Sequence, residues 1–172
     1  KTEEVSVPHI GLNPAVQTAT SRVENVSDHD HYLRTRPRDF SPSLLHRHIH
    51  ALMIPATTYV IAQRVRRLIC QEFEETLRRV QIIVTPVSIP APTIDECQRG
   101  FMEVDGKKIR FQEPRGSFWG LSTIPFNVTG LPALSVCCGF TSSGLPIGMQ
   151  IVAGPFQERL VLQVAHAYER AA

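Results

Sequence analysis

A chain of 172 residues, of which 42% are hydrophobic and 20% charged, is typical of one globular domain with a sizeable core. Its 18 basic and 16 acidic residues give a net charge of +2, which argues against the strongly basic surface of many nucleic-acid-binding proteins. No stretch reaches the roughly 20 apolar residues of a membrane span, and the first four residues do not resemble a signal peptide. The four cysteines form no C-x-x-C pair, so we expect reduced thiols in a cytoplasmic protein.

The first half of the chain predicts three helices. Asn13-Pro14 begins the first, whose apolar residues recur at helical spacing and which stops before Pro37. Ser41-Pro42 begins a short second helix in the same way. A longer third helix is predicted over Thr57–Arg79, because an apolar stripe recurs there and two glutamates precede arginines by four residues.

The second half predicts mostly strands. The apolar run Ile82–Val84 indicates a strand buried on both faces, and three prolines then make 86–92 an irregular connector. Two short segments, Phe101–Val104 and Ile109–Phe111, flank Asp105-Gly106 and predict a β-hairpin. The remaining predicted elements are a short helix over Ser117–Ile124, turns over Pro125–Pro132, strands over Ala133–Cys137 and Ile147–Ala153, and a closing amphipathic helix over Gln157–Arg170.

This succession of helices and short buried strands indicates the α/β class. Only three or four strands are clear, which is few for a sheet covered on both faces, so we expect an unfinished parallel sheet. The chain is therefore predicted to form a single incomplete domain over 1–172, with residues 1–40 as a lead-in helix. Open strand edges in such a sheet predict association with a second copy or with a partner.

Two clusters in the helical half are candidates for ligand binding. His46, His48 and His50 suggest a metal site, but positions 46 and 50 share a helix face that 48 does not, and no carboxylate or cysteine completes a tetrahedral set. We expect a partly exposed polar helix and no metal. Arginines at positions 64, 66, 67, 78 and 79 could face RNA, but nearby glutamates at 72, 74 and 75 favour a solvated, paired face and no nucleic-acid partner.

Five stretches, in order along the chain, carry a resemblance to a known family: Tyr59–Arg66, Ile83–Pro86, Ile89–Pro92, Thr123–Val136 and Gly144–Val152. They resemble the C-terminal half of the amidase-signature enzymes, and the likeness extends over nearly the whole chain from about Asp28. The resemblance implies the C-terminal portion of a mixed-sheet α/β/α fold, with the sheet incomplete in this chain. It also implies hydrolysis of a carboxamide C–N bond and no cofactor.

The resemblance implies a catalytic triad of a serine nucleophile, a second serine and a lysine base, next to a Gly/Ser-rich oxyanion loop. In the family these groups lie in the N-terminal half, and no Gly-Ser-Ser-rich segment occurs in this sequence. Ser142-Ser143-Gly144 lies in a predicted turn, while Lys107 and Lys108 follow a hairpin turn where a base would be solvated. We predict no catalytic residue in this chain and no activity of the isolated chain.

A substrate pocket is implied around the segment that precedes Thr123. The candidates for its lining are Arg115, Phe118, Trp119, Gly120 and Asn127. Trp119 or Phe118 would form an apolar wall, although Trp119 fits a core position equally well, and Arg115 could hold a carboxylate. In the glutamine-dependent tRNA amidotransferase A subunits an acidic residue is expected where Gly120 stands, so a neutral amide is favoured over glutamine.

Three functional hypotheses follow. The first is a C-terminal portion of an amidase that supplies sheet and pocket wall to a small-molecule amide substrate. The second is an inert interaction module or truncated relic of an amidase, and the third is an A-subunit-like piece of a tRNA-dependent amidotransferase. The expected partner is the N-terminal half of the amidase domain or a second copy of the chain, with no nucleic acid and no membrane.

Overall fold

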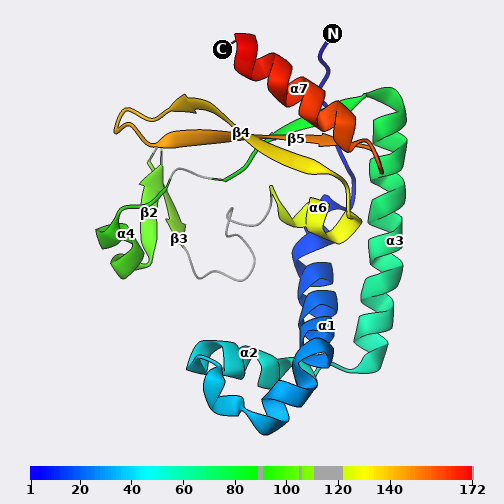
Figure 1. The fold of residues 1–172 in the computed structure, drawn as a ribbon, viewed down its shortest axis with the longest axis vertical. Coiled ribbons are helices and arrows are strands. Elements are labelled where there is room, and N and C mark those ends of the chain that lie inside the picture. Colours follow the sequence, from blue (N-terminus) through cyan, green and yellow to red (C-terminus); the bar gives the residue numbers. More distant parts are fainter. Residues whose placement is uncertain (89–90, 105, 111–121, 172) are drawn as a thin grey trace.

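The computed structural model describes residues 1–88, 91–104, 106–110 and 122–171 (Figure 1). The helices in these ranges are α1 (Asn13–Thr35), α2 (Pro42–Leu52), α3 (Ala56–Arg79), α4 (Ile94–Arg99), α6 (Ile124–Thr129) and α7 (Glu158–Ala171), with short 3-10 turns η1 (Ile10–Leu12) and η2 (Pro37–Asp39). The strands are β1 (Ile82–Pro86), β2 (Phe101–Val104), β3 (Lys107–Arg110), β4 (Ala133–Phe140) and β5 (Pro146–Ala153). Both helices and strands are present, as the α/β class requires.

The described strands form a three-stranded sheet in the order β1-β5-β4 and a separate β2-β3 hairpin. Every one of these pairings is antiparallel, so the expectation of a parallel sheet is wrong for this part of the chain. The reason is local for β4 and β5, because a tight turn at 141–144 reverses the chain between them. The hairpin at 101–110 is confirmed, although its second strand begins at Lys107.

The three-stranded sheet separates two hydrophobic clusters. Alternate residues of β5 face opposite sides: Val152 packs toward Phe73 of α3 and Phe126 of α6, while Ile151 packs toward Val161 of α7. Figure 1 shows α7 above this sheet and α6 below it. The rings of Phe73 and Phe126 meet edge to face at 5.7 Å, which fixes α6 against α3.

Strand β1 is less buried than its sequence indicates. Ile83 lies in the cluster shared with α3 and α6, but Val84 on the opposite face is 52% exposed. Helix α7 packs on β4 and β5 rather than on the outer part of β1. The prediction of a strand buried on both faces is therefore wrong at Val84.

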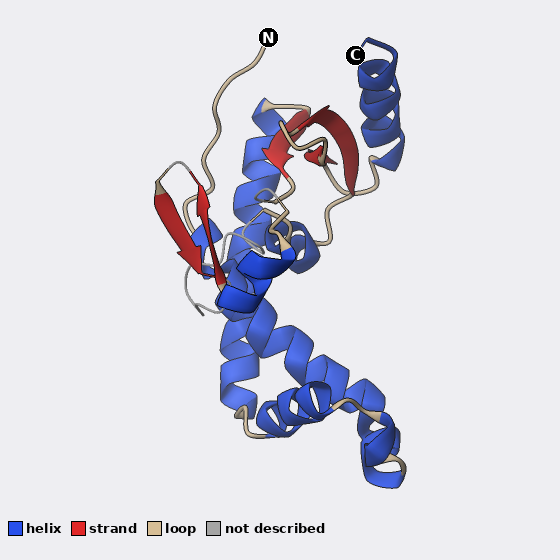
Figure 2. Cartoon of the chain, turned by 90° about the vertical axis from the view of Figure 1, so that its left-hand side faces the viewer, coloured by secondary structure: helices blue, strands red, loops and turns tan. Residues whose placement is uncertain are grey.

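The three predicted helices of the first half are confirmed as α1, α2 and α3. Helix α1 packs along α3, and α2 crosses α1 at the end of the molecule away from the sheet (Figures 1 and 2). Ser41 caps α2 by accepting a hydrogen bond from the Leu44 N–H at 3.4 Å. Asn13 is buried inside the first turn of α1, where its side chain donates to the Ile10 carbonyl at 2.9 Å.

Two helices lie where the sequence predicts none. Thr93 and Glu96 form a reciprocal capping box that starts α4 directly after the proline-rich connector. Helix α6 occupies part of the stretch predicted as turns, with Pro125 in its first turn and Gly130 ending it in the left-handed region at φ 73°. Most of the helix predicted over Ser117–Ile124 lies outside the described residues.

Among the described residues, no helix is both long and apolar enough to cross a membrane. The four cysteines are free thiols, with Cys70 partly buried and the other three exposed. Burial raises the pKa of the Cys70 thiol.

Candidate functional site

A row of three polar residues, of which Gln150 is buried, crosses the sheet on the face toward α6. The strand register places Thr85 of β1 and Ser135 of β4 opposite Gln150 of β5. Gln150 is only 6% exposed, and its Nε2 donates to Thr85 Oγ1 at 3.1 Å and to the Ser122 carbonyl at 2.8 Å. Both amide protons of this buried side chain are therefore used in hydrogen bonds. Gln150 thus links the sheet to the segment that enters α6.

Ser122 is held from a second direction as well. Its hydroxyl donates to the carbonyl of Val87, the residue that follows β1. The Val87 N–H in turn donates to the Gly148 carbonyl at 3.1 Å. A Cβ at position 148 would lie 2.9 Å from Val87 Cγ2, so a glycine is needed for this close approach. Gly148, Val87, Ser122 and Gln150 thus form one connected anchor.

An unsatisfied polar atom lies next to this anchor. Ser88 Oγ is buried and has no hydrogen-bond partner among the described residues. A buried hydroxyl without a partner costs free energy, so this position is suited to a polar group supplied to the site.

Of the predicted pocket residues, the structure describes one. Asn127 lies on the exposed side of α6, and its backbone N–H bonds the Thr123 carbonyl at 3.3 Å. Arg115, Phe118, Trp119 and Gly120 lie outside the described residues, in the segment that leads directly into Ser122. Their role in a pocket stays a prediction.

The serines and lysines weighed as lookalikes of a catalytic group lie apart. Ser143 shares a hydrogen bond of 2.8 Å with Thr141 inside the turn between β4 and β5. Lys107 and Lys108 are exposed on β3, and Lys108 Nζ lies 3.6 Å above the Phe101 ring. In the described ranges no lysine is hydrogen-bonded to a serine.

Some of the arginines of α3 bind other parts of the chain. Arg66 Nε donates to the Val128 carbonyl at 2.6 Å and ties α3 to α6. Arg79 pairs with Glu3 at 3.0 Å rather than with the glutamate four residues before it, and Glu72 binds His9. Among the described residues no ion pair joins an α3 arginine to an α3 glutamate, so the expected pairing is wrong. Glu72 and Arg79 take partners from the N-terminal segment instead.

The three histidines of α2 divide as their spacing predicts. His46 and His50 share one face, with ring centroids 4.0 Å apart. His48 faces the other way and is 6% exposed, with its ring centroid 5.6 Å from that of His29 and 5.5 Å from that of Phe40. The helix is therefore partly exposed, as predicted, with His46 and His50 on its exposed face. Burial, then His29 and Arg47, lower the pKa of His48. In the described part of the chain, no group of three or more His, Cys, Asp or Glu residues could hold a metal.

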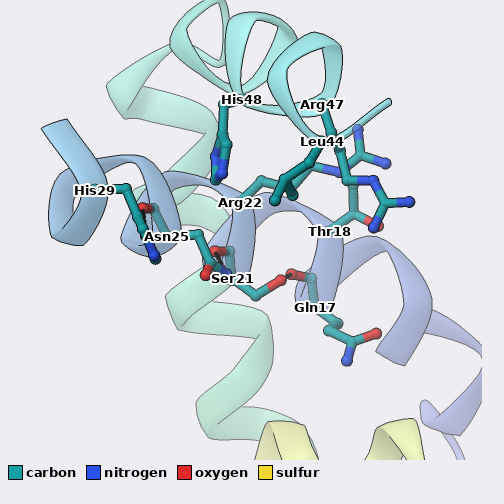
Figure 3. Close-up of a pocket in the computed structure, with 9 residues that line it drawn as sticks. All are labelled: Gln17, Thr18, Ser21, Arg22, Asn25, His29, Leu44, Arg47 and His48. Carbon is teal, nitrogen blue, oxygen red and sulfur yellow. Dashed lines mark hydrogen bonds between the residues drawn. The ribbon is translucent and has the colours of Figure 1, made fainter. Parts of the chain in front are cut away.

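A polar cavity of about 610 Å³ lies between α1 and α2 (Figure 3). Its lining comprises Gln17, Thr18, Ser21, Arg22, Asn25 and His29 of α1, with Leu44, Arg47 and His48 of α2. Sequence reasoning missed this cavity, although a signal was present. Gln17, Ser21, Asn25 and His29 recur every four residues, which places a polar stripe along one face of α1.

Comparison with known proteins links the chain to a family. The sequence model of the family described as Amidase matches residues 6–162. The chain is 36% identical over 152 residues to the A subunit of glutamyl-tRNA(Gln) amidotransferase from a Picosynechococcus species, over 83% of this chain and 28% of that protein. It is 39% identical over 145 residues to the corresponding protein of a Cyanothece species, over 81% of this chain and 28% of that protein. The chain therefore spans about 28% of the length of these relatives.

Solved structures give the same picture of the fold. A protein from a vestigial complex that bears on the origin of an s-triazine catabolic enzyme superposes with a TM-score of 0.82 at 28% identity, over 99% of this chain and 36% of that one. A crystal structure of an amidase gives 0.82 at 26% identity, over 98% and 37%. The A subunit of glutamyl-tRNA(Gln) amidotransferase from Thermotoga maritima gives 0.68 at 28% identity, over 99% and 34%.

Proposed function

Because the chain belongs to the amidase signature family, we propose that it forms the C-terminal part of an enzyme that hydrolyses a carboxamide C–N bond. It supplies part of the sheet and one wall of the substrate pocket. The serine–serine–lysine triad comes from the N-terminal half of the domain, and this chain contributes no catalytic residue.

The observation that carries this proposal is the anchor at Ser122. Gln150 and the Val87 carbonyl hold Ser122 from two sides, at the point where the segment with the pocket candidates enters the fold. A pocket wall must be held in place for substrate to be positioned, and buried hydrogen bonds from a sheet achieve this. The unpartnered Ser88 hydroxyl provides a further polar contact at the same end of the sheet.

The substrate is a small amide that carries no ammonium group. Trp119 or Phe118 lines the pocket as an apolar wall, Arg115 holds a carboxylate if the substrate carries one, and Asn127 contributes from α6. Gly120 leaves a substrate ammonium without a charge partner, which disfavours glutamine.

A second candidate function is supported by the relatives themselves. Curated relatives at 36% and 39% identity are amidotransferase A subunits, so an A-subunit-like role is the main alternative. The two candidates differ in substrate, because the first accepts a neutral amide and the second requires glutamine.

The partner of this chain is the N-terminal half of the amidase domain, and in its absence the chain associates with itself. Among the described strands, β1 and β4 each pair on one side only, both with β5. Val84 and Phe140 add apolar side chains that are 52% and 68% exposed. Sedimentation of the isolated chain as a monomer at all concentrations would contradict this part of the proposal.

The pocket assignment is tested in an enzyme assembled from this chain and an N-terminal amidase half. Trp119→Ala should lower kcat/KM for benzamide by about tenfold, the cost of one good apolar contact at the reacting substrate. The matched control is Phe156→Ala, because Phe156 is 94% exposed. It follows the end of β5, whereas the contact of Val87 with Gly148 lies near the start of that strand. Equal activity of the two variants would refute the pocket role of Trp119, and faster release of ammonia from glutamine than from benzamide would favour the second candidate.

A further inference from the structure

The cavity between α1 and α2 is separate from the proposed amide site. It lies where α2 crosses α1, at the end of the helical layer away from the sheet, and none of its lining residues belongs to the anchor at Ser122 (Figures 1 and 3). Its volume of about 610 Å³ falls in the range of small-molecule sites.

The cavity carries two positive charges and no carboxylate. Arg22 of α1 and Arg47 of α2 line it, and neither has a carboxylate within ion-pair distance among the described residues. Figure 3 shows their long side chains extending in the same direction from the two helices. Two acids of α1 are engaged elsewhere, because Glu24 accepts from Tyr59 Oη at 3.1 Å and Asp30 pairs with Arg34 at 2.9 Å, and Asp28 does not line the cavity.

The hydrogen-bond donors left free in the cavity favour an anion. The Ser21 hydroxyl donates to the Gln17 carbonyl at 2.7 Å, and Asn25 Nδ2 donates to the Ser21 carbonyl at 2.7 Å. The guanidinium groups of Arg22 and Arg47, the Thr18 hydroxyl and the Gln17 amide make no such bond in the described structure. The free groups of this surface are therefore mainly donors, two of them permanently charged.

His48 closes the inner side of the cavity with a second unused polar group. Its side chain is buried to more than nine-tenths, and its ring makes contacts with aromatic neighbours but no hydrogen bond in the described structure. His29, beside it, donates Nδ1–H to the Asn25 carbonyl at 2.8 Å, which leaves Nε2 as its free nitrogen. A buried imidazole without a partner, on the wall of a polar cavity, is available to a bound ligand.

We propose that the cavity between α1 and α2 binds the phosphate group of a small phosphate monoester, with Arg22 and Arg47 as the two charged ligands. Two guanidinium forks match a dianion with three terminal oxygens, and the Thr18 hydroxyl and Gln17 amide reach the oxygens that remain. The volume exceeds that of phosphate alone, so the ester group occupies the rest of the cavity. Eight of the nine lining side chains carry a polar group, so an ester group with hydroxyls, such as glycerol, finds hydrogen-bond partners there.

A carboxylate and a cation fit less well. A carboxylate has two oxygens and one charge, and it leaves one of the two guanidinium groups without a counter-ion. A cation would meet two fixed positive charges and no carboxylate ligand. The site is independent of the proposed amide hydrolysis, so either proposal can fail without the other.

The proposal is tested by calorimetric titration of the intact chain at low ionic strength with inorganic phosphate, glycerol 3-phosphate, glycerol and acetate. Glycerol 3-phosphate should bind most tightly, phosphate should bind more weakly, and glycerol and acetate should not bind. Arg22→Gln and Arg47→Gln should each weaken binding by about tenfold or more, as expected for the loss of one charge-assisted hydrogen-bond pair. Arg47→Lys should lie between wild type and Arg47→Gln, because it keeps the charge and loses the fork.

Arg64→Gln is the matched control, since Arg64 is an exposed arginine of α3 outside the cavity. It should leave the affinity for glycerol 3-phosphate unchanged. Three results would overturn the proposal: no heat with either phosphate ligand, acetate bound as tightly as phosphate, or equal weakening by Arg64→Gln and Arg47→Gln. Because Arg47 is exposed, its substitutions should not disturb folding, and urea unfolding of each variant verifies this.

Discussion

Replacement of Gln150 by methionine tests the anchor that the proposed pocket depends on. Methionine has nearly the same length and volume, so the substitution removes two hydrogen bonds while core packing is kept. The bonds at stake join Gln150 Nε2 to Thr85 Oγ1 at 3.1 Å and to the Ser122 carbonyl at 2.8 Å.

The expected loss follows from these two bonds. Each contributes about 1 kcal/mol net, and a buried partner left without a donor adds a further penalty. Ser122 and Thr85 are only partly buried, so water recovers some of this penalty. We therefore expect Gln150→Met to lower the free energy of unfolding by about 2–3 kcal/mol, or roughly 5–10 °C in Tm for a domain of this size.

Urea unfolding followed by circular dichroism measures this loss. The control is Gln163→Met, because Gln163 lies exposed on α7 and should change stability by less than about 0.5 kcal/mol. If Gln150→Met unfolds at the same urea concentration as Gln163→Met, Gln150 does not tie the sheet to Ser122 and the structural basis for the pocket wall is lost.

Three further predictions concern stability. Gly148→Ala should destabilise the chain by about 1–2 kcal/mol in urea unfolding, because its Cβ would lie 2.9 Å from Val87 Cγ2, whereas Gly11→Ala, with no atom within 4 Å of the added carbon, should be nearly neutral. Phe73→Ala should cost about 3–5 kcal/mol in the same assay, since this side chain is 2% exposed in the main cluster; a loss below about 1 kcal/mol would contradict that packing. Because the pKa of His48 is lowered in the folded chain, the contribution of neutral His48 to the free energy of unfolding is complete above its unfolded pKa near 6.5. This contribution is lost as the pH falls through the lower folded pKa, so wild type should lose more stability between pH 7.5 and 5 than His48→Leu. Parallel stability profiles of the two proteins over this pH range would refute this.

The elements predicted well are those with local signals. Helices α1 and α2 follow from a proline at the start and apolar residues at helical spacing, and α3 and α7 follow from that spacing. Strands β4 and β5 follow from apolar segments around a glycine-containing turn. In each case the residues that decide the structure lie within a few positions of one another.

The elements predicted wrongly or missed depend on context. The exposure of Val84 depends on where α7 packs, and α7 begins more than 70 residues later in the chain. The capping box of α4 was visible as Thr93 and Glu96, but the surrounding prolines indicated an irregular segment. Helix α6 was obscured in the same way, because a proline that starts a helix also occurs in turns.

In the candidate site, too, local features were predictable from the sequence and contacts between distant residues were not. The link from Gln150 to Thr85 spans 65 positions, and nothing in the local sequence of either residue predicts it. The cavity between α1 and α2 was predictable in part, because its polar stripe repeats every four residues on α1, but the arginine and histidine opposite come from α2. Only the packing of the two helices brings these groups together.

The most direct test of the central claim is release of ammonia from benzamide by the chain alone and by the chain mixed with an N-terminal amidase half that carries the Gly-Ser-Ser segment and its lysine. We predict no turnover by either part alone and turnover by the mixture, at a rate that Gln150→Met lowers. Turnover by the isolated chain would contradict the claim that the triad lies elsewhere. A stable mixture without activity toward any amide would contradict the claim that this chain completes an amidase site.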